Sequence, residues 1–377
     1  MRFANITGYI GMLILSVLPA SCSKTQPELA LGDEISFNMS AEVKANEITT
    51  ANIYDMGVYA TLDKEGTSFT SSQRLQNFMN NILVSKETNG WSASPKHYWP
   101  IDQNMKLSFF AYAPYSGNSS EIQPPANKDW SADKTLRIVY SPNENAYYQS
   151  DFCIATAALD RTSTPDDHGN IPPVQLNFKH ALSWITFAAN YIGDLPEGCY
   201  MIVDEIILKN VVGTNSLVYS PQQSSNFFYW EEIPAGTKRS GSYTVSISKA
   251  TLSNTPIPQK GNGTPVYQDI STTEGYLFLI PQVINPSLQT RAAGEEETIE
   301  SYAMIDVVFS YIKEDINNTV IAQFNTSMVL PYTSWGIGQK IKYVFTLDVN
   351  TASLITLSPS IELWEESGNT HTNTEIK

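Results

Sequence analysis

Apolar residues recur at every second position in several segments of this 377-residue chain, and this pattern most limits how it can fold. In an extended chain successive side chains point to opposite faces, so each such segment has one apolar and one polar side. The sequence therefore predicts an all-β protein with half-buried antiparallel strands. The clearest alternations are Val174-Leu176-Phe178, Tyr243-Val245-Ile247, Ile305-Val307-Phe309-Tyr311 and Tyr343-Phe345-Leu347.

The remaining segments support the same class. With 20 tyrosines and 21 prolines, the composition suits many short strands joined by turns. Only residues 74–84 suggest a helix, because Leu75, Phe78, Met79 and Leu83 have helical spacing. Further strands are expected at residues 35–43, 56–61, 106–112, 135–140, 202–212, 276–280 and 355–364. These strands are expected to pack as β-sandwiches.

The length of the chain favours two domains. The most linker-like interior stretch is residues 161–173, which has three prolines and almost no apolar content, and residues 193–198 are the alternative boundary. Residues 287–297 have the composition of an exposed hairpin tip. The expected division is a signal peptide at 1–21, a lipidated tether at 22–34, β-sandwiches at 35–165 and 172–366, and a polar tail at 367–377.

The first 21 residues have the features of a bacterial export signal. Arg2 is followed by an apolar run at residues 9–18, which is too short to span a bilayer. The run leads to Ala20-Ser21-Cys22, which resembles a lipobox, so cleavage is expected between Ser21 and Cys22 with acylation of the Cys22 thiol, for example by palmitate. The alternative is an ordinary secretory signal cut near Ala20. No later apolar run approaches spanning length, so membrane contact is expected through lipid on Cys22.

Charge and cysteine content exclude several classes of protein. The chain has 23 basic and 38 acidic residues, a net charge of −15, which argues against nucleic acid as a partner. Three cysteines are too few for a disulfide-rich scaffold. Cys153 and Cys199 could pair in an oxidising compartment, but small buried side chains are the favoured interpretation.

The sequence contains no concentrated catalytic motif, so no catalytic residue, cofactor or metal is assigned, and no enzyme is expected. Asp166, Asp167 and His168 are adjacent and could ligate a metal, but ordinary turn chemistry explains them better. His180 follows a strand and is expected to be a hydrogen-bonded packing residue.

Aromatic residues offer a second kind of site, a platform on which a sugar could stack. Core packing is the favoured role for most of them. Four consecutive aromatics, however, cannot all face one core in an extended segment, so at least one residue of 227–230 is expected to be exposed or covered by a partner. The candidates are Trp91, Tyr98, Trp99, Phe227, Phe228, Tyr229 and Trp230.

The order of several short motifs resembles the fimbrillin family, the pilins and pilin-like surface lipoproteins of Bacteroides-type bacteria. They are Tyr98-Trp99-Pro100, the segment 106–114, Val174-x-Leu176-x-Phe178-x-His180, the segment 276–282 and Trp335-x-x-Gly338-Gln339-Lys340, closing on Trp364. The resemblance implies two tandem transthyretin-like β-sandwiches with Greek-key strands. It also implies a lipid-anchored protein of the outer membrane and cell surface, or of the fimbrium itself, with other pilin subunits or surface ligands of host or bacteria as partners.

The resemblance further implies a way to assemble. In polymerising members a protease removes the first strand, and a strand from the next subunit fills the groove by β-augmentation. The corresponding removable strand here carries Ile35, Phe37, Met39, Ala41 and Val43.

Lys44 follows this strand as a possible maturation site, while the first arginine after the signal is Arg74. A strand that stays in place would favour an anchor, a terminal subunit or a stand-alone lipoprotein. Residues 354–363 are the expected donor strand. The competing hypothesis is a stand-alone glycan-binding lipoprotein in which Trp230 carries the ligand.

Overall fold

The computed structural model describes residues 31–41, 53–88, 90–220, 227–234, 237, 239–246, 256–261, 266–270, 277–286 and 302–363. This part of the chain is built from β-strands apart from one turn of 3-10 helix, η1 (Ala146–Tyr148), which confirms the all-β class. Each expected strand overlaps an observed one. No helix among the described residues is long and apolar enough to cross a membrane. Cys22, Val43, Lys44 and the tail lie outside the described residues.

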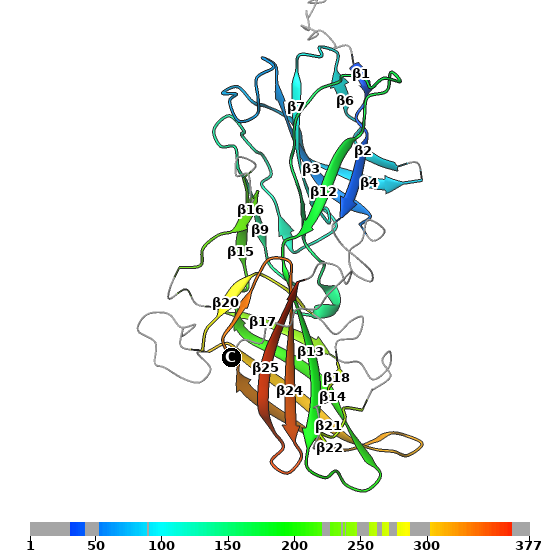
Figure 1. The fold of residues 1–377 in the computed structure, drawn as a ribbon, viewed down its shortest axis with the longest axis vertical. Helices are drawn as coiled ribbons and strands as arrows, with labels where there is room; N and C mark the ends of the chain where they lie inside the picture. Colours follow the sequence, from blue (N-terminus) through cyan, green and yellow to red (C-terminus); the bar gives the residue numbers. More distant parts are fainter. Residues whose placement is uncertain are drawn as a thin grey trace, which may run out of the picture.

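The amino-terminal unit, at the top of Figure 1, is organised around an eight-stranded sheet with the order β10-β12-β2-β5-β4-β3-β7-β11. Because β10 also pairs with β7, seven of these strands form a closed ring, and β11 pairs with β7 outside it. A two-stranded sheet of β1 (Leu31–Glu34) and β6 (Tyr98–Pro100) lies beside it. The eight strands are β2 (Phe37–Ala41), β3 (Asp55–Asp63), β4 (Gln76–Glu87), β5 (Gly90–Ser94), β7 (Lys106–Ala113), β10 (Cys153–Ala155), β11 (Ala158–Arg161) and β12 (Val174–His180).

The helix predicted at residues 74–84 is wrong, since most of this segment forms strand β4. The pairing of β3 with β4 shifts register twice, between Val58 and Ala60 and again between Ala60 and Thr61. Each shift places an extra residue in β4, and an extra residue reverses the face to which later side chains point. The apolar residues therefore lose their period of two and acquire a spacing that imitates a helix.

The carboxyl-terminal unit, at the bottom of Figure 1, contains a five-stranded and a four-stranded sheet. Side chains from both layers, including Phe187, Leu208, Phe309 and Tyr343, share one core. One layer has the order β18 (Gln268–Asp269), β13 (Ser183–Ile192), β24 (Gln339–Asp348), β25 (Ser353–Leu363), with β19 (Leu277–Leu279) also on β13. The other has the order β17 (Gly241–Ser246), β14 (Cys199–Val211), β21 (Met304–Lys313), β22 (Thr319–Val329). The short strands β20 (Gln282–Ile284) and β23 (Thr333–Trp335) pair separately.

The expectation of purely antiparallel pairing is wrong for two strand pairs. β2 runs parallel to β12, and β13 runs parallel to β24. Parallel neighbours require a long connection between them, and both pairs join segments more than a hundred residues apart. Local alternation of apolar residues carries no information on the direction of such distant partners.

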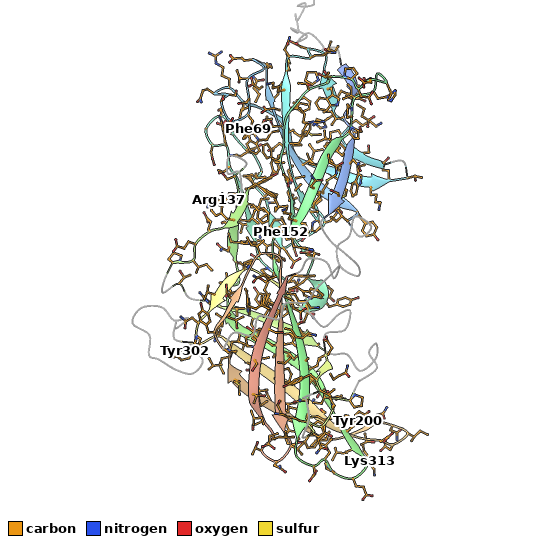
Figure 2. The ribbon with its side chains drawn as sticks, in the orientation of Figure 1. Phe69, Arg137, Phe152, Tyr200, Tyr302 and Lys313 are labelled. Carbon is orange, nitrogen blue, oxygen red and sulfur yellow. The ribbon has the colours of Figure 1, made fainter. Side chains whose placement is uncertain are left out.

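A further sheet, which we call the middle sheet, joins the two units. Its order is β16 (Phe228–Trp230), β15 (Asn215–Tyr219), β9 (Leu136–Tyr140), β8 (Ile122–Gln123), so it combines strands from before and after residues 161–173. Its side chains enter a core with Phe110, Phe152 and Phe278, and Figure 2 shows Phe152 between the two units. Strand β12, which lies within the range expected for the second domain, belongs to the ring of the first unit. The domain limits stay a prediction.

Candidate functional site

Strand β2 is the part of the predicted removable strand that the structure describes. It lies between β12 and β5, pairing in parallel from Phe37 opposite Val174 to Ala41 opposite Phe178, and meeting β5 where Phe37 lies opposite Trp91. Two backbone hydrogen bonds fix its start. Ile35 N donates to His97 O (2.9 Å), and Val174 N donates to Ser36 O (2.8 Å). Strand β2, the second described strand of the chain, is therefore inserted between two strands from later in the sequence (Figure 1).

The side chains of this strand divide cleanly between core and solvent. Ile35, Phe37 and Met39 are 1%, 4% and 8% exposed and belong to the core of the amino-terminal unit. The Phe37 ring packs edge-on against Phe109, with the ring centroids 5.9 Å apart. On the other face Ser40 Oγ donates to Asn177 Oδ1 (2.5 Å). The strand thus fills a row of apolar positions, as expected for a strand that another strand of the same pattern could replace.

Arg74, the first arginine after the signal, lies outside strand β2. It lies in the segment before β4, where its guanidinium pairs with Glu65 at 2.9 Å and both side chains are exposed. Strand β3 precedes it in the chain and lies between β4 and β7, with Met56 and Val58 fully buried. Cleavage after Arg74 would therefore remove a central strand of the ring as well as β2.

The expected donor segment forms β25, the last described strand. It pairs with β24 through its whole length and ends the order of its sheet, so its other edge is unpaired among the described strands. Leu354 is buried, whereas Ile355 and Ile361 are 40% and 39% exposed. Such an edge is open to pairing with a further strand.

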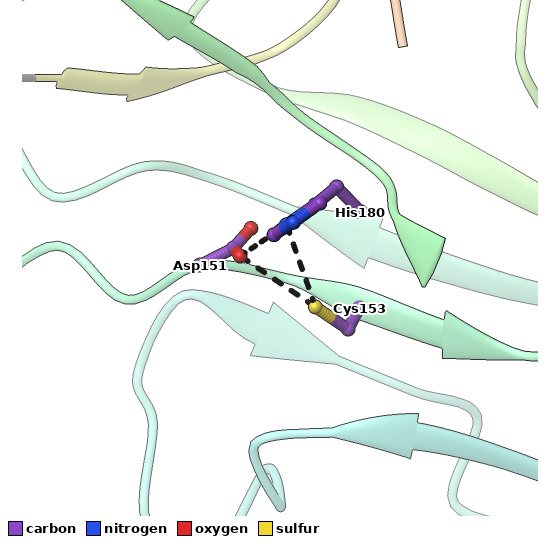
Figure 3. Close-up of side chains that lie close together, drawn as sticks. All are labelled: Asp151, Cys153 and His180. Carbon is purple, nitrogen blue, oxygen red and sulfur yellow. Dashed lines mark hydrogen bonds and ion pairs between the residues drawn. The ribbon is translucent and has the colours of Figure 1, made fainter. Parts of the chain in front are cut away.

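A second group of side chains, Asp151, Cys153 and His180, meets inside the amino-terminal unit (Figure 3). Cys153 in β10 lies opposite His180 in β12, and Asp151 comes just before β10. His180 Nδ1 and Asp151 Oδ2 are 2.5 Å apart, and the Cys153 thiol lies 3.6 Å from that oxygen and 3.9 Å from Nδ1. All three residues are buried.

This cluster does not have the geometry of a metal centre. Two ligands on a tetrahedral zinc ion, with bonds of about 2.0–2.1 Å, would be about 3.3 Å apart, well beyond the 2.5 Å between Nδ1 and Oδ2. That separation is instead the one of a short hydrogen bond between the ring nitrogen and the carboxyl oxygen. Burial, and then the Asp151 carboxylate, raise the pKa of Cys153 well above its ordinary value, so the thiol keeps its proton and is a poor nucleophile. The cluster is a hydrogen-bonded link between β10 and β12.

The structure also shows the surroundings of the other candidate residues from the sequence. Asp166 Oδ1 accepts from the backbone N–H of His168 and of Asn170, both at 2.9 Å, which is the turn chemistry expected for this segment. Trp99 is buried at 3% exposure, as expected for a core residue. Cys153 and Cys199 both carry free thiols, so they do not pair. The mutual contact of Asp151, Cys153 and His180 was not foreseen, because 27 residues separate His180 from Cys153.

The four consecutive aromatics have different surroundings. Phe228 is buried, and Phe227 packs against Tyr219 and Phe228. Trp230 donates its indole N–H to Ala181 O (2.7 Å) and contacts Tyr140 and Phe152, so its ring is occupied within the protein. Tyr229 is 40% exposed. The expectation that one of the four faces outward is met by Tyr229, and the ligand-binding role considered for Trp230 does not fit this environment.

A family comparison covers every strand of the ring except β2. Residues 42–199, which include β3 to β13, match the family described as fimbrillin-like. This chain has a fimbrillin-like domain. The match is to a family of fimbrial proteins rather than to an enzyme family.

Two known proteins are similar to this chain over most of its length. The fimbrium subunit Fim1C of Phocaeicola vulgatus is 24% identical over 389 residues, covering 97% of this chain and 98% of the relative. The crystal structure of a fimbrial protein from Bacteroides vulgatus matches with a TM-score of 0.54 and 17% identity, covering 88% of this chain and 100% of that chain. Because it covers 88% of this chain, the likeness in fold extends beyond residues 42–199.

Proposed function

We propose that this fimbrillin-like protein is a lipid-anchored subunit or accessory protein of a fimbria at the cell surface, and that it contributes to adhesion. In this proposal residues 1–21 are removed, Cys22 carries the lipid, and the residues between Cys22 and β1 tether the protein to the outer membrane. Its partners are further pilin subunits, which it meets by donor-strand β-augmentation. We further propose that its units are two tandem transthyretin-like domains.

The observation that carries this proposal is the position of β2. It is the second described strand of the chain, yet it lies inside the closed ring and contributes Phe37 and Met39 to the core. A strand near one terminus can leave without breaking any connection between the other strands. Its loss would expose the buried row of Ile35, Phe37 and Met39 positions to an incoming strand with the same alternation.

Lys44 is well placed to mark such a cut. It lies three residues after the end of β2 and eleven before β3 begins at Asp55, so cleavage after it would release β1 and β2 and leave β3 intact. Arg74 lacks this property, because β3 would be lost as well. The proposal therefore assigns maturation to a lysine-directed cut and the donor role to β25, whose outer edge is unpaired among the described strands.

The test is intact-mass analysis and amino-terminal sequencing of the protein recovered from cells, for the wild type and for Lys44→Ala. We expect a wild-type chain that begins at residue 45 in a polymer fraction, and a Lys44→Ala chain that begins with acylated Cys22 and stays monomeric. Lys64→Ala is the matched control, because Lys64 is an exposed lysine in the turn after β3.

Each outcome decides a different part of the proposal. Wild-type chains that all begin at acylated Cys22, with no polymer, would overturn strand removal and leave an anchor or accessory protein. Chains that begin at residue 22 or nearby without lipid, and remain in the soluble fraction, would overturn the anchor. Equal effects of Lys64→Ala and Lys44→Ala would remove Lys44 as the cleavage site.

A further inference from the structure

A cavity of about 660 Å³ opens beside the middle sheet, away from β2 and β25. Its walls come from two segments, the turn between β14 and β15 and the stretch that follows β16. This volume lies within the range of about 300–1,000 Å³ typical of small-molecule sites. The lining contains Tyr229, the one exposed aromatic of residues 227–230.

Two backbone segments approach each other closely beside the lining residues Val212, Gly213 and Ser240. A Cβ on Gly241 would lie 2.8 Å from Val211 O and 3.0 Å from the Gly213 Cα, so a side chain at this position would clash with backbone. Tyr243 closes the same corner, with its hydroxyl 3.3 Å from Val212 O. A wall fixed by backbone contacts keeps its shape when no ligand is present.

Some polar groups of the cavity bind other residues of the protein, and two charged groups have no ion-pair partner among the described residues. Glu231 forms an ion pair with Arg137, and Asn215 Nδ2 donates to Glu231 O at 3.0 Å. Arg239 Nη1 donates to Val283 O at 2.9 Å, which orients the guanidinium, and burial lowers the pKa of this group. Among the described residues no ion pair neutralises Arg239 or Glu232. One charged donor and one charged acceptor therefore line the same cavity.

We propose that this cavity binds a neutral sugar unit of a glycan, with the sugar's apolar face on the Tyr229 ring. A sugar has an apolar C–H face and a rim of hydroxyls that both donate and accept hydrogen bonds, and the lining offers a ring face, an acceptor at Glu232 and a donor at Arg239. Hydrogen bonds to charged groups are the stronger kind. The chain's net charge of −15 disfavours an acidic ligand. The site goes beyond the proposed fimbrial role, because neither strand of the assembly mechanism forms it.

The test is saturation-transfer NMR on the full protein, using neutral trisaccharides of glucose, galactose, mannose and N-acetylglucosamine, with trigalacturonate as an acidic probe. We expect saturation transfer to at least one neutral trisaccharide. Tyr229→Ala should weaken its binding by about tenfold or more. Glu232→Gln should weaken it as well, while both variants keep the wild-type unfolding midpoint.

Tyr54→Ala is the matched control. Tyr54 is a 68% exposed tyrosine just before β3 in the amino-terminal unit and does not line the cavity, so its loss should leave binding unchanged. Transfer to none of the neutral trisaccharides, transfer to trigalacturonate alone, or an equal loss in Tyr54→Ala and Tyr229→Ala would overturn the proposal.

Discussion

At the scale of single residues, the buried carboxyl of Glu121 links three parts of the middle region. It accepts hydrogen bonds from Asn143 N (2.8 Å) and Ser150 N (2.9 Å), and the Tyr140 hydroxyl lies 3.4 Å away. Glu121 is only 3% exposed, and burial raises its pKa above the ordinary value of 4.5 despite these hydrogen bonds. Its charged form is thus held at a cost in desolvation.

This pKa shift predicts how stability depends on pH. Because the folded pKa of Glu121 lies above the unfolded one, the folded state binds the extra proton between the two values. The contribution of Glu121 to stability is therefore complete below about pH 4.5 and is lost as the pH rises through the folded pKa. We expect the free energy of unfolding of wild type, relative to Glu121→Gln, to fall over this window in urea titrations at several pH values. A difference that stays constant or rises with pH would contradict the assignment.

Single residues also show which features of the candidate sites could be predicted from the sequence. Trp99 as a core residue, His180 as a hydrogen-bonded packing residue and the turn at Asp166 follow from local context, and the structure agrees with all three. The run of four aromatics at residues 227–230 predicts that one of them is exposed, but it does not identify which one. Tyr229 is singled out only because Trp230 finds the carbonyl of Ala181, a partner 49 residues away.

At the scale of elements, strand β4 is shaped by residues that depart from ordinary strand geometry. Asn81 has a φ of +53°, in the left-handed region, at the point where the register with β3 shifts. Its Oδ1 accepts from the Tyr112 hydroxyl at 2.6 Å, and its Nδ2 donates to Ser116 Oγ at 3.1 Å. Asparagine tolerates this backbone conformation better than most residues with a Cβ.

Two substitutions at Asn81 separate backbone strain from hydrogen bonding. Asn81→Gly loses both hydrogen bonds but accepts the positive φ, so we expect a loss of about 1–2 kcal/mol in the free energy of unfolding. Asn81→Ala loses the same bonds and adds left-handed strain of about 1–2 kcal/mol, so it should be the less stable variant. Urea denaturation of both measures the difference, and an Asn81→Ala variant as stable as Asn81→Gly would argue against a bulge at this site.

Elements with regular alternation were the easiest to predict. The strands β12, β21 and β24 lie where the period of two places them, because apolar side chains recur at every second position in each. Strand β4 could not be predicted in this way, since two extra residues break its period. The partners of β2 were equally hidden, because parallel pairing with β12 depends on how the chain returns after more than a hundred residues.

At the scale of the whole molecule, the middle sheet makes the two units depend on each other. β9 pairs with β15 from Tyr140 opposite Asn215 to Leu136 opposite Tyr219, and the Tyr219 hydroxyl donates to Ala155 O. Strand β12 adds a second connection, because it lies in the ring while the chain continues directly into β13. A cut within residues 161–173, which lie between β9 and β15 in the sequence, should therefore leave the halves bound together.

A site-specific protease sequence inserted between His168 and Gly169 tests this expectation. The insertion point is exposed, and Gly169 has nothing within 4 Å of its Cβ position, so the insertion should be tolerated. After cleavage we expect two fragments on a denaturing gel but one species of unchanged size on a gel-filtration column. Separate elution of the fragments without denaturant would favour independent domains divided at residues 161–173.

The parallel pairing of β2 with β12 determines how the protein responds to tension. In a parallel pair, a pull on the start of one strand and on the end of the other acts along the strands, so the bonds from Phe37–Val174 to Ala41–Phe178 are loaded in shear and must break together. The start of β2 follows β1 in the chain, and the end of β12 leads directly into β13 of the carboxyl-terminal unit (Figure 1). Force between the two ends of the chain would therefore meet a rigid clamp rather than a zipper that opens one bond at a time.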